Sequence, residues 1–573
     1  MRSTFSGLNT LVRGINVNQL SQQTVGHNIS NADAEGYSRQ SVNLAATRGQ
    51  FQTSVYGEVI VGTGVDSTSL TRARDIYADR QYWSENSTME YYNSRAKEYD
   101  KLEAIFNDTT NEGIESALEE FYKSWQTLSV YASDSSSRIS TLEHGKVLAD
   151  RIHSTTKQLQ EQIEANYSDI RLNVGKVNEM LDHVVELNKN IMGAEATGAM
   201  ANDLRDQRDL LVDNISSFVN VNVYESSDGM YSLVSNGVSL VNGLTHLTLE
   251  MSDPIANKDY GINDYSILIK EAQIAYQPLS GSLKAEMDAI VEDKSYIDAM
   301  ADISAFLLSD LNEQHQQGHG IDTTQTAGIN FFGDASTKYT WDETNRVLKA
   351  EVYNNTLSAT AHTVAINANY DPGDPDYYYV SATVSGGTVT STTAAMNKID
   401  IIAALNINTQ LTAPNGHLLV AASGYGYEPV ATGSSPSTWT TVPNESGDGA
   451  NAVMVGTLFN QDMTKTPKYD ATQTAAQNEA KRAIGTISLN AYYNKSMTEL
   501  GSNAEAMDSK VVAQEEIMTQ ITEWRETTAG VNWNEELTNM IMFQQGFSAC
   551  SRCLTTMDEM LDRLINSTGM VGR

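Results

Sequence analysis

Two cysteines near the end of the chain have the Cys-x-x-Cys spacing of redox and zinc sites. Cys550 and Cys553 are the only cysteines in the sequence, so a disulfide framework is excluded. A redox pair lies at the start of a helix that follows a strand, and a zinc site needs two further ligands. Both cysteines instead fall inside a helical pattern, where Cβ atoms three residues apart are about 5–6 Å apart, beyond the roughly 3.8 Å of a disulfide. We therefore predict that Cys550 packs as a small apolar side chain.

Two histidines, His315 and His319, have the i, i+4 spacing of a helical zinc site. In metalloproteases of that kind a glutamate base follows the first histidine, but here the residue is Gln316, and Gly318 predicts the end of the helix. The acidic stretch 371–376 contains two prolines and lacks the spacing of a calcium-binding loop, so we interpret it as a surface turn. No phosphate-binding or dinucleotide-binding glycine motif occurs in a fitting context. We predict no catalytic, cofactor-binding or metal-binding residue, and a protein that is not an enzyme.

The chain as a whole is long and acidic. Its 573 residues exceed what one compact core holds, so we expect three or four domains. The 72 Asp and Glu against 38 Lys and Arg give a formal charge of −34, which repels phosphate backbones and anionic membranes, so we predict neither nucleic-acid nor membrane binding. No uninterrupted apolar run exceeds five residues, so we expect neither a membrane span nor a cleaved signal peptide.

The spacing of apolar residues changes several times along the chain and predicts an α+β multidomain fold. Long amphipathic helices need one another to bury their apolar faces, which favours a helical rod. In chain order we expect an N-terminal helix at 1–35, a mostly helical rod domain at 36–320 with a β segment near 219–280, a mainly β, outward-facing inserted domain at 321–460, a returning helical part of the rod domain at 461–531, and a C-terminal coiled-coil helix at 532–573. Helices at both ends with β residues between them bring the two chain ends together.

The most regular pattern is a heptad repeat in the last helix. Its apolar residues step by four and three, with polar residues between them, at Phe543, Phe547, Cys550, Leu554, Met557, Leu561 and Leu564. A looser stripe marks the first helix at Phe5, Leu8, Val12 and Ile15. An isolated helix of this kind is marginal in water, so we predict that the terminal helices pair. Two outcomes remain open: a coiled coil that closes a monomer, or terminal helices that complete their packing on neighbouring subunits.

Motifs at both ends of the chain resemble the flagellar axial proteins, which comprise the rod, hook and hook-associated proteins. They are Asn28-Ile-Ser-Asn31 and Gly36-Tyr37-Ser-Arg39-Gln40 near the start, and the stretch 531–537 near the end. In the middle, Ala-Asn-Asp-Leu-Arg-Asp-Gln-Arg-Asp-Leu-Leu-Val at 201–212 is similar to a segment of the hook-associated protein 1 family. The chain is identified as a member of that family over roughly 1–320 and 445–573. It departs from the family at Trp533, where many relatives carry an aliphatic residue, and in having cysteines.

The same motifs also have a purely structural interpretation. Gly36 fits a turn with a positive backbone angle φ, and Tyr37 and Arg39 then act in packing and ion pairing. Within 201–212, three aspartates alternate with two arginines, which favours short-range ion pairs along one helix. We expect the packed face of that helix at Leu204, Leu211 and Ile215, with Val212 nearby.

The resemblance implies a structural subunit of the bacterial flagellum that forms the junction between hook and filament. It implies assembly through the paired terminal helices, export by the flagellar type III apparatus without a cleaved signal, and a location outside the cell. The implied partners are further copies of the chain, the hook protein, the second hook–filament junction protein, and an export chaperone at the C-terminal helix; no cofactor is implied. The implied assembly interface comprises Phe5, Leu8, Val12, Ile15, Asn28, Asn31, Gly36, Tyr37, Arg39 and the seven heptad residues from Phe543 to Leu564.

Three alternatives remain open at this point. One is another axial protein, such as the hook, the distal rod or the second junction protein, although the chain length and the 201–212 segment argue against it. Another is an enzyme carried on an axial scaffold, which would need a catalytic cluster within 321–460; the two histidines of that region, His362 and His417, lie in no recognisable motif. The last is a β insertion that serves as a surface-binding or adhesin module.

Overall fold

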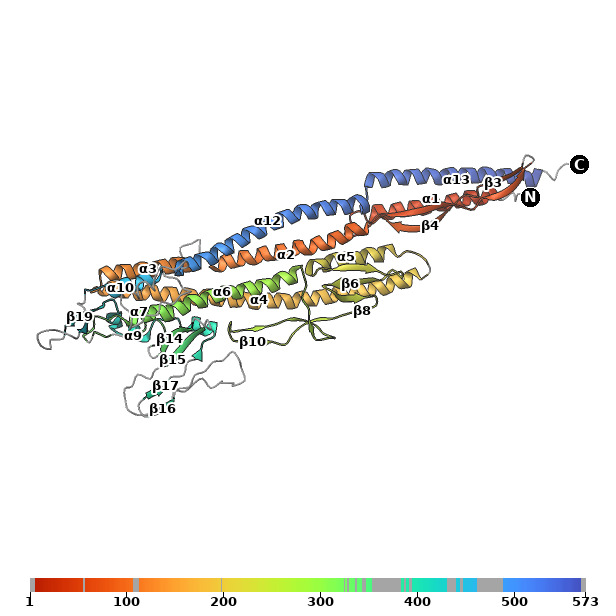
Figure 1. The fold of residues 1–573 in the computed structure, drawn as a ribbon. Helices are drawn as coiled ribbons and strands as arrows, with labels where there is room; N and C mark the ends of the chain where they lie inside the picture. Colours follow the sequence, from red (N-terminus) through yellow and green to blue (C-terminus); the bar gives the residue numbers. More distant parts are fainter. Residues whose placement is uncertain are drawn as a thin grey trace, which may run out of the picture.

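The computed structural model describes most of the chain, in the following ranges: 6–54, 57–106, 113–196, 198–323, 325–326, 329–334, 337–342, 347–352, 383–385, 388–390, 394–429, 439–443, 447–460 and 488–567. The molecule is elongated, and both chain ends lie at the same end of it (Figure 1). The acidic stretch 371–376, interpreted above as a surface turn, lies outside the described residues.

Long helices form what we call the body of the molecule. They are α2 (Ile76–Phe106), α3 (Ile114–Val130), α4 (Ser135–Glu195), α5 (Asn202–Phe218), α6 (Ser282–Phe306) and α12 (Leu489–Ala529). α4 has 61 residues and begins where the side chain of Asp134 accepts hydrogen bonds from the N–H groups of Ser136 and Ser137. Buried residues such as Ile163, Ile170 and Val177 recur along one of its faces. Because each helix has one apolar face to cover, the body helices share one hydrophobic core.

At the far end of the body, α6 continues into a π-helical turn, η2 (Leu307–Leu311), and a short helix, α7 (Asn312–Gln316). There Phe121 of α3 packs against Phe331 and Phe332, with ring centroids 5.6 and 5.7 Å away. All three rings are fully buried. This aromatic cluster joins α3 to the residues that follow α7.

The body core also contains carboxyl groups. Glu286 and Asp293 of α6 are buried, and Asn173 of α4 donates a hydrogen bond of 2.7 Å to Glu286 Oε1. Burial, reinforced by the nearby carboxylates of Asp169 and Glu98 respectively, raises the pKa of each to about 8. Both side chains are therefore mostly protonated at neutral pH.

Short strands pack along one side of α4, where the sequence predicts a β segment near 219–280. β5 (Asn222–Glu225), β6 (Tyr231–Ser235), β7 (Val238–Asn242) and β8 (Thr245–His246) form an antiparallel sheet in chain order. β9 (Leu249–Met251), β12 (Ile267–Ile269) and β13 (Ile274–Ala275) form a second sheet, and β10 (Ile255–Asn257) pairs with β11 (Ile262–Asp264). The switch from a helical to an alternating pattern at Val219 is confirmed.

The described part of 321–460 is mainly β, with helices between the strands. β14 (Thr337–Asp342), β15 (Val347–Val352) and β18 (Ala394–Ala395) form one sheet, while β16 (Thr383–Ser385) pairs with β17 (Thr388–Thr390) and β19 (Tyr425–Pro429) with β20 (Trp439–Pro443). The helices are α8 (Lys398–Ala404), α9 (Thr409–Thr412), η3 (Gly416–Leu419) and α10 (Ala450–Leu458). α10 packs against α3, so the C-terminal part of this region lies against the body.

The first and last helices pair side by side at the opposite end of the molecule (Figure 1). α1 (Ser6–Ser30) and α13 (Trp533–Ser567) form what we call the terminal pair. Along α1 runs the β arm, in which β1 (Gln40–Ala46) pairs with β4 (Val65–Arg72) and β2 (Gln50–Ser54) pairs with β3 (Gly57–Val61). The core of the body includes no residue of α1 or α13, so the terminal pair is attached by other contacts.

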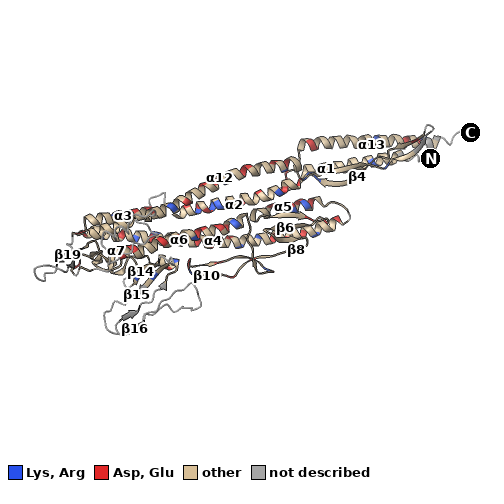
Figure 2. Cartoon of the chain, in the orientation of Figure 1, with Lys and Arg blue, Asp and Glu red and all other residues tan. Residues whose placement is uncertain are grey.

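Charge is distributed along the whole molecule. Acidic side chains occur on the body helices and on the terminal pair (Figure 2). Among the described helices, none is both long enough and apolar enough to cross a membrane.

Candidate functional site

Small residues on α1 face the heptad residues of α13. A methyl group at Gly7 would lie 2.7 Å from Met557 Cε, and one at Gly14 would lie 3.0 Å from Cys550 Sγ. A step of seven residues forward along α1 thus matches a step of seven residues back along α13, which is an antiparallel register. Because Gly7 and Gly14 have no side chain, the two helices approach closely at these positions. The prediction that Cys550 packs in this contact is confirmed.

The heptad residues are covered on one side only. The six whose side chains the structure describes, Phe543, Phe547, Cys550, Leu554, Met557 and Leu561, are all half-buried. On α1, Leu8 and Ile15 are half-buried and Val12 is 38% exposed. Phe5 and the side chain of Leu564 lie outside the described residues. The terminal helices therefore pair, as predicted, and still expose part of their apolar surface.

Asn28 joins three elements at the inner end of the terminal pair. Its side chain is buried, and Nδ2 donates hydrogen bonds to Gln40 O (2.9 Å) and to Glu536 Oε2 (3.1 Å). Its Oδ1 accepts hydrogen bonds from the N–H of Gln40 (3.0 Å) and the hydroxyl of Tyr37 (2.8 Å). Both side-chain donors and two acceptor positions are used, so Asn28 ties α1 to the β arm and to α13.

Arg39 supplies a second link to the same acidic side chain. Its Nε donates to Glu536 Oε1 at 2.8 Å, and its Nη2 donates to Glu535 Oε1 at 2.7 Å. Glu536 is buried, so it is held by a charge-assisted hydrogen bond from Arg39 as well as by Asn28. Two residues of the N-terminal motif thus bind one carboxylate near the start of α13.

The loop between α1 and the β arm has the predicted turn. Gly36 has φ of +77°, a conformation that favours glycine, and its Cα lies against Leu210 of α5. Tyr37 packs edge-on against His27, and burial raises the pKa of its hydroxyl. Asn31 Nδ2 donates to His27 O at 2.9 Å, which satisfies a carbonyl at the end of α1. The packing and pairing roles predicted for Tyr37 and Arg39 are confirmed.

A buried ion cluster lies on the other side of this loop, at the surface of α5. Arg72 Nη1 donates to Asp206 Oδ1 at 2.6 Å and to Asp209 Oδ2 at 2.8 Å. Asp206 also accepts hydrogen bonds from the N–H (3.0 Å) and the hydroxyl (2.7 Å) of Ser38. Burial acts to raise the pKa of Asp209, but Arg74 and Arg72 outweigh it and hold that pKa below its usual value. The β arm is therefore bound to the body by ion pairs.

The expectation of ion pairs along α5 itself is wrong. Arg205 pairs instead with Glu195 at the end of α4 (2.7 Å) and with Glu225 of β5 (2.6 Å). Several charged residues also lie on the buried face of α5. Of the apolar residues expected there, Leu204 and Leu211 are only half-buried, whereas Ile215 and the neighbouring Val212 are buried. The spacing of charges along one helix therefore does not predict whether their ion-pair partners lie in the same helix or in other elements.

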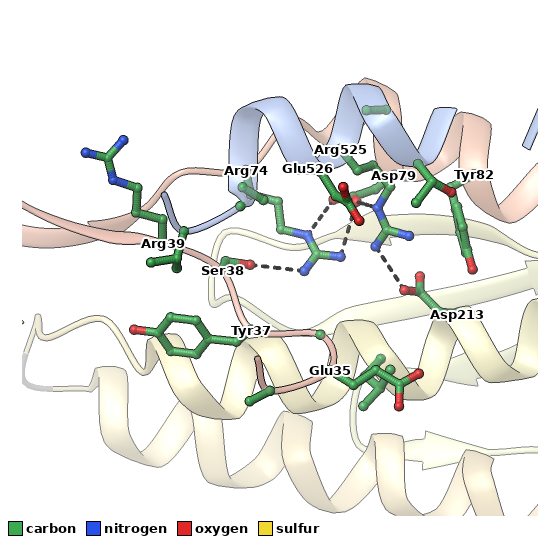
Figure 3. A pocket seen from close by; sticks show the side chains of 18 of the residues that line it. Glu35, Tyr37, Ser38, Arg39, Arg74, Asp79, Tyr82, Asp213, Arg525 and Glu526 are labelled. Atoms are coloured by element: carbon green, nitrogen blue, oxygen red, sulfur yellow. Dashed lines mark hydrogen bonds and ion pairs between the residues drawn. The ribbon is translucent and has the colours of Figure 1, made fainter. Parts of the chain in front are cut away.

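A cavity of about 1140 Å³ lies between these contacts and the end of α12. Figure 3 shows Arg525 of α12 beside Asp79 of α2 and Asp213 of α5, with N···O distances of 3.0 and 2.9 Å. Arg74 reaches Asp79 (2.8 Å) and the Ser38 hydroxyl (3.2 Å) from the β-arm side. We call these contacts, together with those of Asn28, Arg39 and Arg72, the joint. Its side chains connect elements to one another and form no arrangement of nucleophile and base.

The histidines and cysteines singled out above serve structural roles where the structure describes them. His315 is fully buried; its Nε2 accepts from the N–H of Ala421 (2.9 Å), its Nδ1 lies 2.8 Å from Ile329 O, and burial lowers its pKa to about 4. His319 lies beyond the end of α7 with both ring nitrogens near backbone carbonyls. Cys550 and Cys553 are free thiols. No group of three metal-ligating side chains occurs within the described ranges.

Sequence reasoning singled out Asn28 and Arg39 but missed the small residues Gly7 and Gly14 of α1 and the partners of the charged residues in the joint. Gly7, Gly14, Ser21 and Asn28 are seven residues apart in the sequence, and that repeat was the available signal for the face that meets α13. The joint offered no comparable signal, because its arginines and aspartates are scattered over four segments.

Comparisons with known proteins cover the whole chain. The family described as flagellar hook-associated protein FlgK helical domain matches residues 99–332, and the family described as flagellar basal body rod FlgEFG protein C-terminal matches 527–567, which includes α13. Flagellar hook-associated protein 1 of Bacillus subtilis is 26% identical over 593 residues and 100% of both chains. The protein of that name from Salmonella typhimurium is 24% identical, over 98% of this chain and 99% of its own.

The fold is also that of a solved structure. The flagellar hook junction protein FlgK from Burkholderia pseudomallei matches with a TM-score of 0.53 and 16% identity, over 78% of this chain and 100% of that one.

Proposed function

Since the chain belongs to the flagellar hook-associated protein 1 family, we propose that it is a structural subunit that forms the junction between the hook and the filament. Members of this family are structural components of the flagellum, and full-length likeness to relatives of that name supports the role. We further propose that the chain acts without enzymatic activity and without a cofactor, through contacts alone.

The observation that carries the proposal is the half-covered terminal pair. Its heptad residues are half-buried in the single chain. Neighbouring subunits can bury the apolar surface that remains exposed, and this burial would stabilise the assembly. The interface we propose consists of the residues named above, from Leu8, Val12 and Ile15 on α1 to the heptad residues of α13. Asn28, Asn31, Gly36, Tyr37 and Arg39 contribute by holding the pair in place rather than by touching a neighbour.

The proposed partners follow from this position in the flagellum. Further copies of the chain would form a ring, the hook protein would lie on one side of it, and the second hook–filament junction protein on the other. Before assembly, an export chaperone would cover the exposed apolar side of α13. The chain would reach the outside of the cell through the flagellar type III apparatus.

The test is incorporation into hooks in a strain that lacks the native gene. Leu554→Glu places a charge in the half-buried seam and should abolish incorporation, leaving hooks without filaments and flagellin in the medium. Thr555→Glu, at the exposed neighbouring position, is the matched control and should assemble normally. The variant protein should still be found in the medium, which separates export from assembly. Normal filaments with Leu554→Glu, or with residues 543–564 deleted, would overturn the proposal.

A further inference from the structure

The hairpin formed by β2 and β3 of the β arm exposes a pair of large apolar side chains. Phe51 of β2 and Ile60 of β3 are direct partners across the hairpin, and they are 74% and 64% exposed. Residues directly opposite in antiparallel strands point to the same face. We call this pair the hairpin patch.

Within the described part of the chain, both side chains of the hairpin patch remain largely exposed. β1 and β4 pack on α1, but the main contact of β2 and β3 among the described elements is with each other. A two-stranded hairpin is at best marginally stable alone in water, and an exposed strand pair with apolar side chains favours contact with another surface. We therefore expect another protein surface to cover the hairpin.

A second apolar patch lies on α13. Trp533, Leu537 and Ile541 are each four residues apart, so they share one face of the helix, and all three are exposed. We call them the α13 patch.

The two patches cannot meet within one chain. The β2–β3 hairpin begins beside the outer end of α1, where Thr10 Oγ1 lies 3.3 Å from Thr63 O. That end of α1 faces Met557, and Trp533 is 24 residues away along α13, or about 35 Å at 1.5 Å per residue. A contact between the two patches must therefore join two molecules.

We propose that the hairpin patch of one copy docks on the α13 patch of the next copy in the ring or tube. This inference rests on the proposed function, because it requires copies to assemble side by side. A head-to-tail interface, which builds rings and tubes, needs two different patches on the same chain, and these two satisfy that requirement on the part of the molecule that carries the open seam. The occupant of the hairpin patch is thus a second copy of this chain.

Site-specific photo-cross-linking in assembled flagella tests the proposal. A photoreactive amino acid replaces Ile60 in the full chain, an epitope-tagged copy is co-expressed, and purified hooks with filaments are irradiated. The expected product is a covalent dimer with the tagged copy, with the link mapped by mass spectrometry to residues 533–541. The same probe at Ile274 of β13, an isoleucine 61% exposed on another hairpin, is the control and should not link to those residues.

Each other outcome has a definite meaning. A link from position 60 to the hook protein, or to another surface of this chain, or no link in chains that are incorporated, would overturn the docking proposal and leave the proposed function intact. Absence of the unmodified chain from hook tips would overturn both.

Charge substitution gives a second readout. Ile60→Glu should lower incorporation at least tenfold, because it places a carboxylate against an apolar surface next to Glu535 and Glu536. Adding Leu537→Lys in the same chain should restore most of it, since the two new charges would meet between copies. Wild-type incorporation of Ile60→Glu, or no recovery in the double variant, would overturn the proposal.

Discussion

Replacing Asn28 with aspartate tests the joint with almost no change in shape. The substitution turns the two N–H donors of Nδ2 into a carboxylate oxygen. That oxygen would face Gln40 O at about 2.9 Å and Glu536 Oε2 at about 3.1 Å, both of which are acceptors. The other oxygen keeps its bonds from Tyr37 and from the N–H of Gln40.

The expected cost follows from these contacts. Two buried acceptors lose their donor, at about 1–3 kcal/mol each, and two carboxylates are brought together, which Arg39 offsets in part. We therefore expect docking of the terminal pair to weaken by about 3–5 kcal/mol. At about 1.4 kcal/mol per factor of ten, backbone amides of α1 and of the start of α13 should exchange hydrogen roughly two to four orders of magnitude faster.

Hydrogen exchange followed by mass spectrometry measures this directly. Asn31→Asp is the matched control, because Asn31 makes one side-chain hydrogen bond, to His27 O at the end of the same helix, and its loss should cost at most about 1 kcal/mol. After correction for the intrinsic exchange rate, which itself falls with pH, acidification that protonates the new carboxyl at position 28 should restore protection, since the acid regains a donor. Equal exchange rates for the two variants would refute the reasoning.

Three further predictions concern the body and the seam. Because burial raises the pKa of Glu286 and Asp293 to about 8, above the values near 4 of the unfolded chain, the unfolded state binds fewer protons between these values and stability falls as pH rises through that window. Glu286→Gln or Asp293→Asn should remove part of this loss and raise Tm at about pH 8–9, as thermal melts across pH would reveal. Gly14→Val should separate α1 from α13, as seen by faster proteolysis of α1, and Cys550→Ala in the same chain should recover much of the protection. Phe121→Ala should lower the free energy of unfolding by about 3–5 kcal/mol in urea titrations, and a loss below about 1 kcal/mol would contradict the buried aromatic cluster.

The helices and their order could be predicted from the sequence because each body helix buries one face. In α4, residues such as Ile170, Val174 and Val177 are both regularly spaced and buried. The spacing of apolar residues along this helix therefore predicts which side chains make tertiary contacts. The change to strands at Val219 follows the same rule, and the regularly spaced heptad residues of α13 mark the face that meets α1, where they are half-buried.

The joint could not be predicted because its partners are distant in sequence. Asp206 and Asp209 meet Arg72, which lies 134 and 137 residues away, and no local pattern indicates such a pair. The α1 face that meets α13 was missed for a different reason. Apolar spacing highlights large side chains, whereas Gly7 and Gly14 contribute by having none.

The bond between Asn28 and Glu536 spans 508 positions of the chain. A polypeptide that emerges from its N-terminus first cannot make this bond until nearly all of it has arrived. A copy that stops anywhere in the body would lack α13 and with it the partner of α1. The contact between the first and last helices can therefore form only in a chain that contains both of its ends.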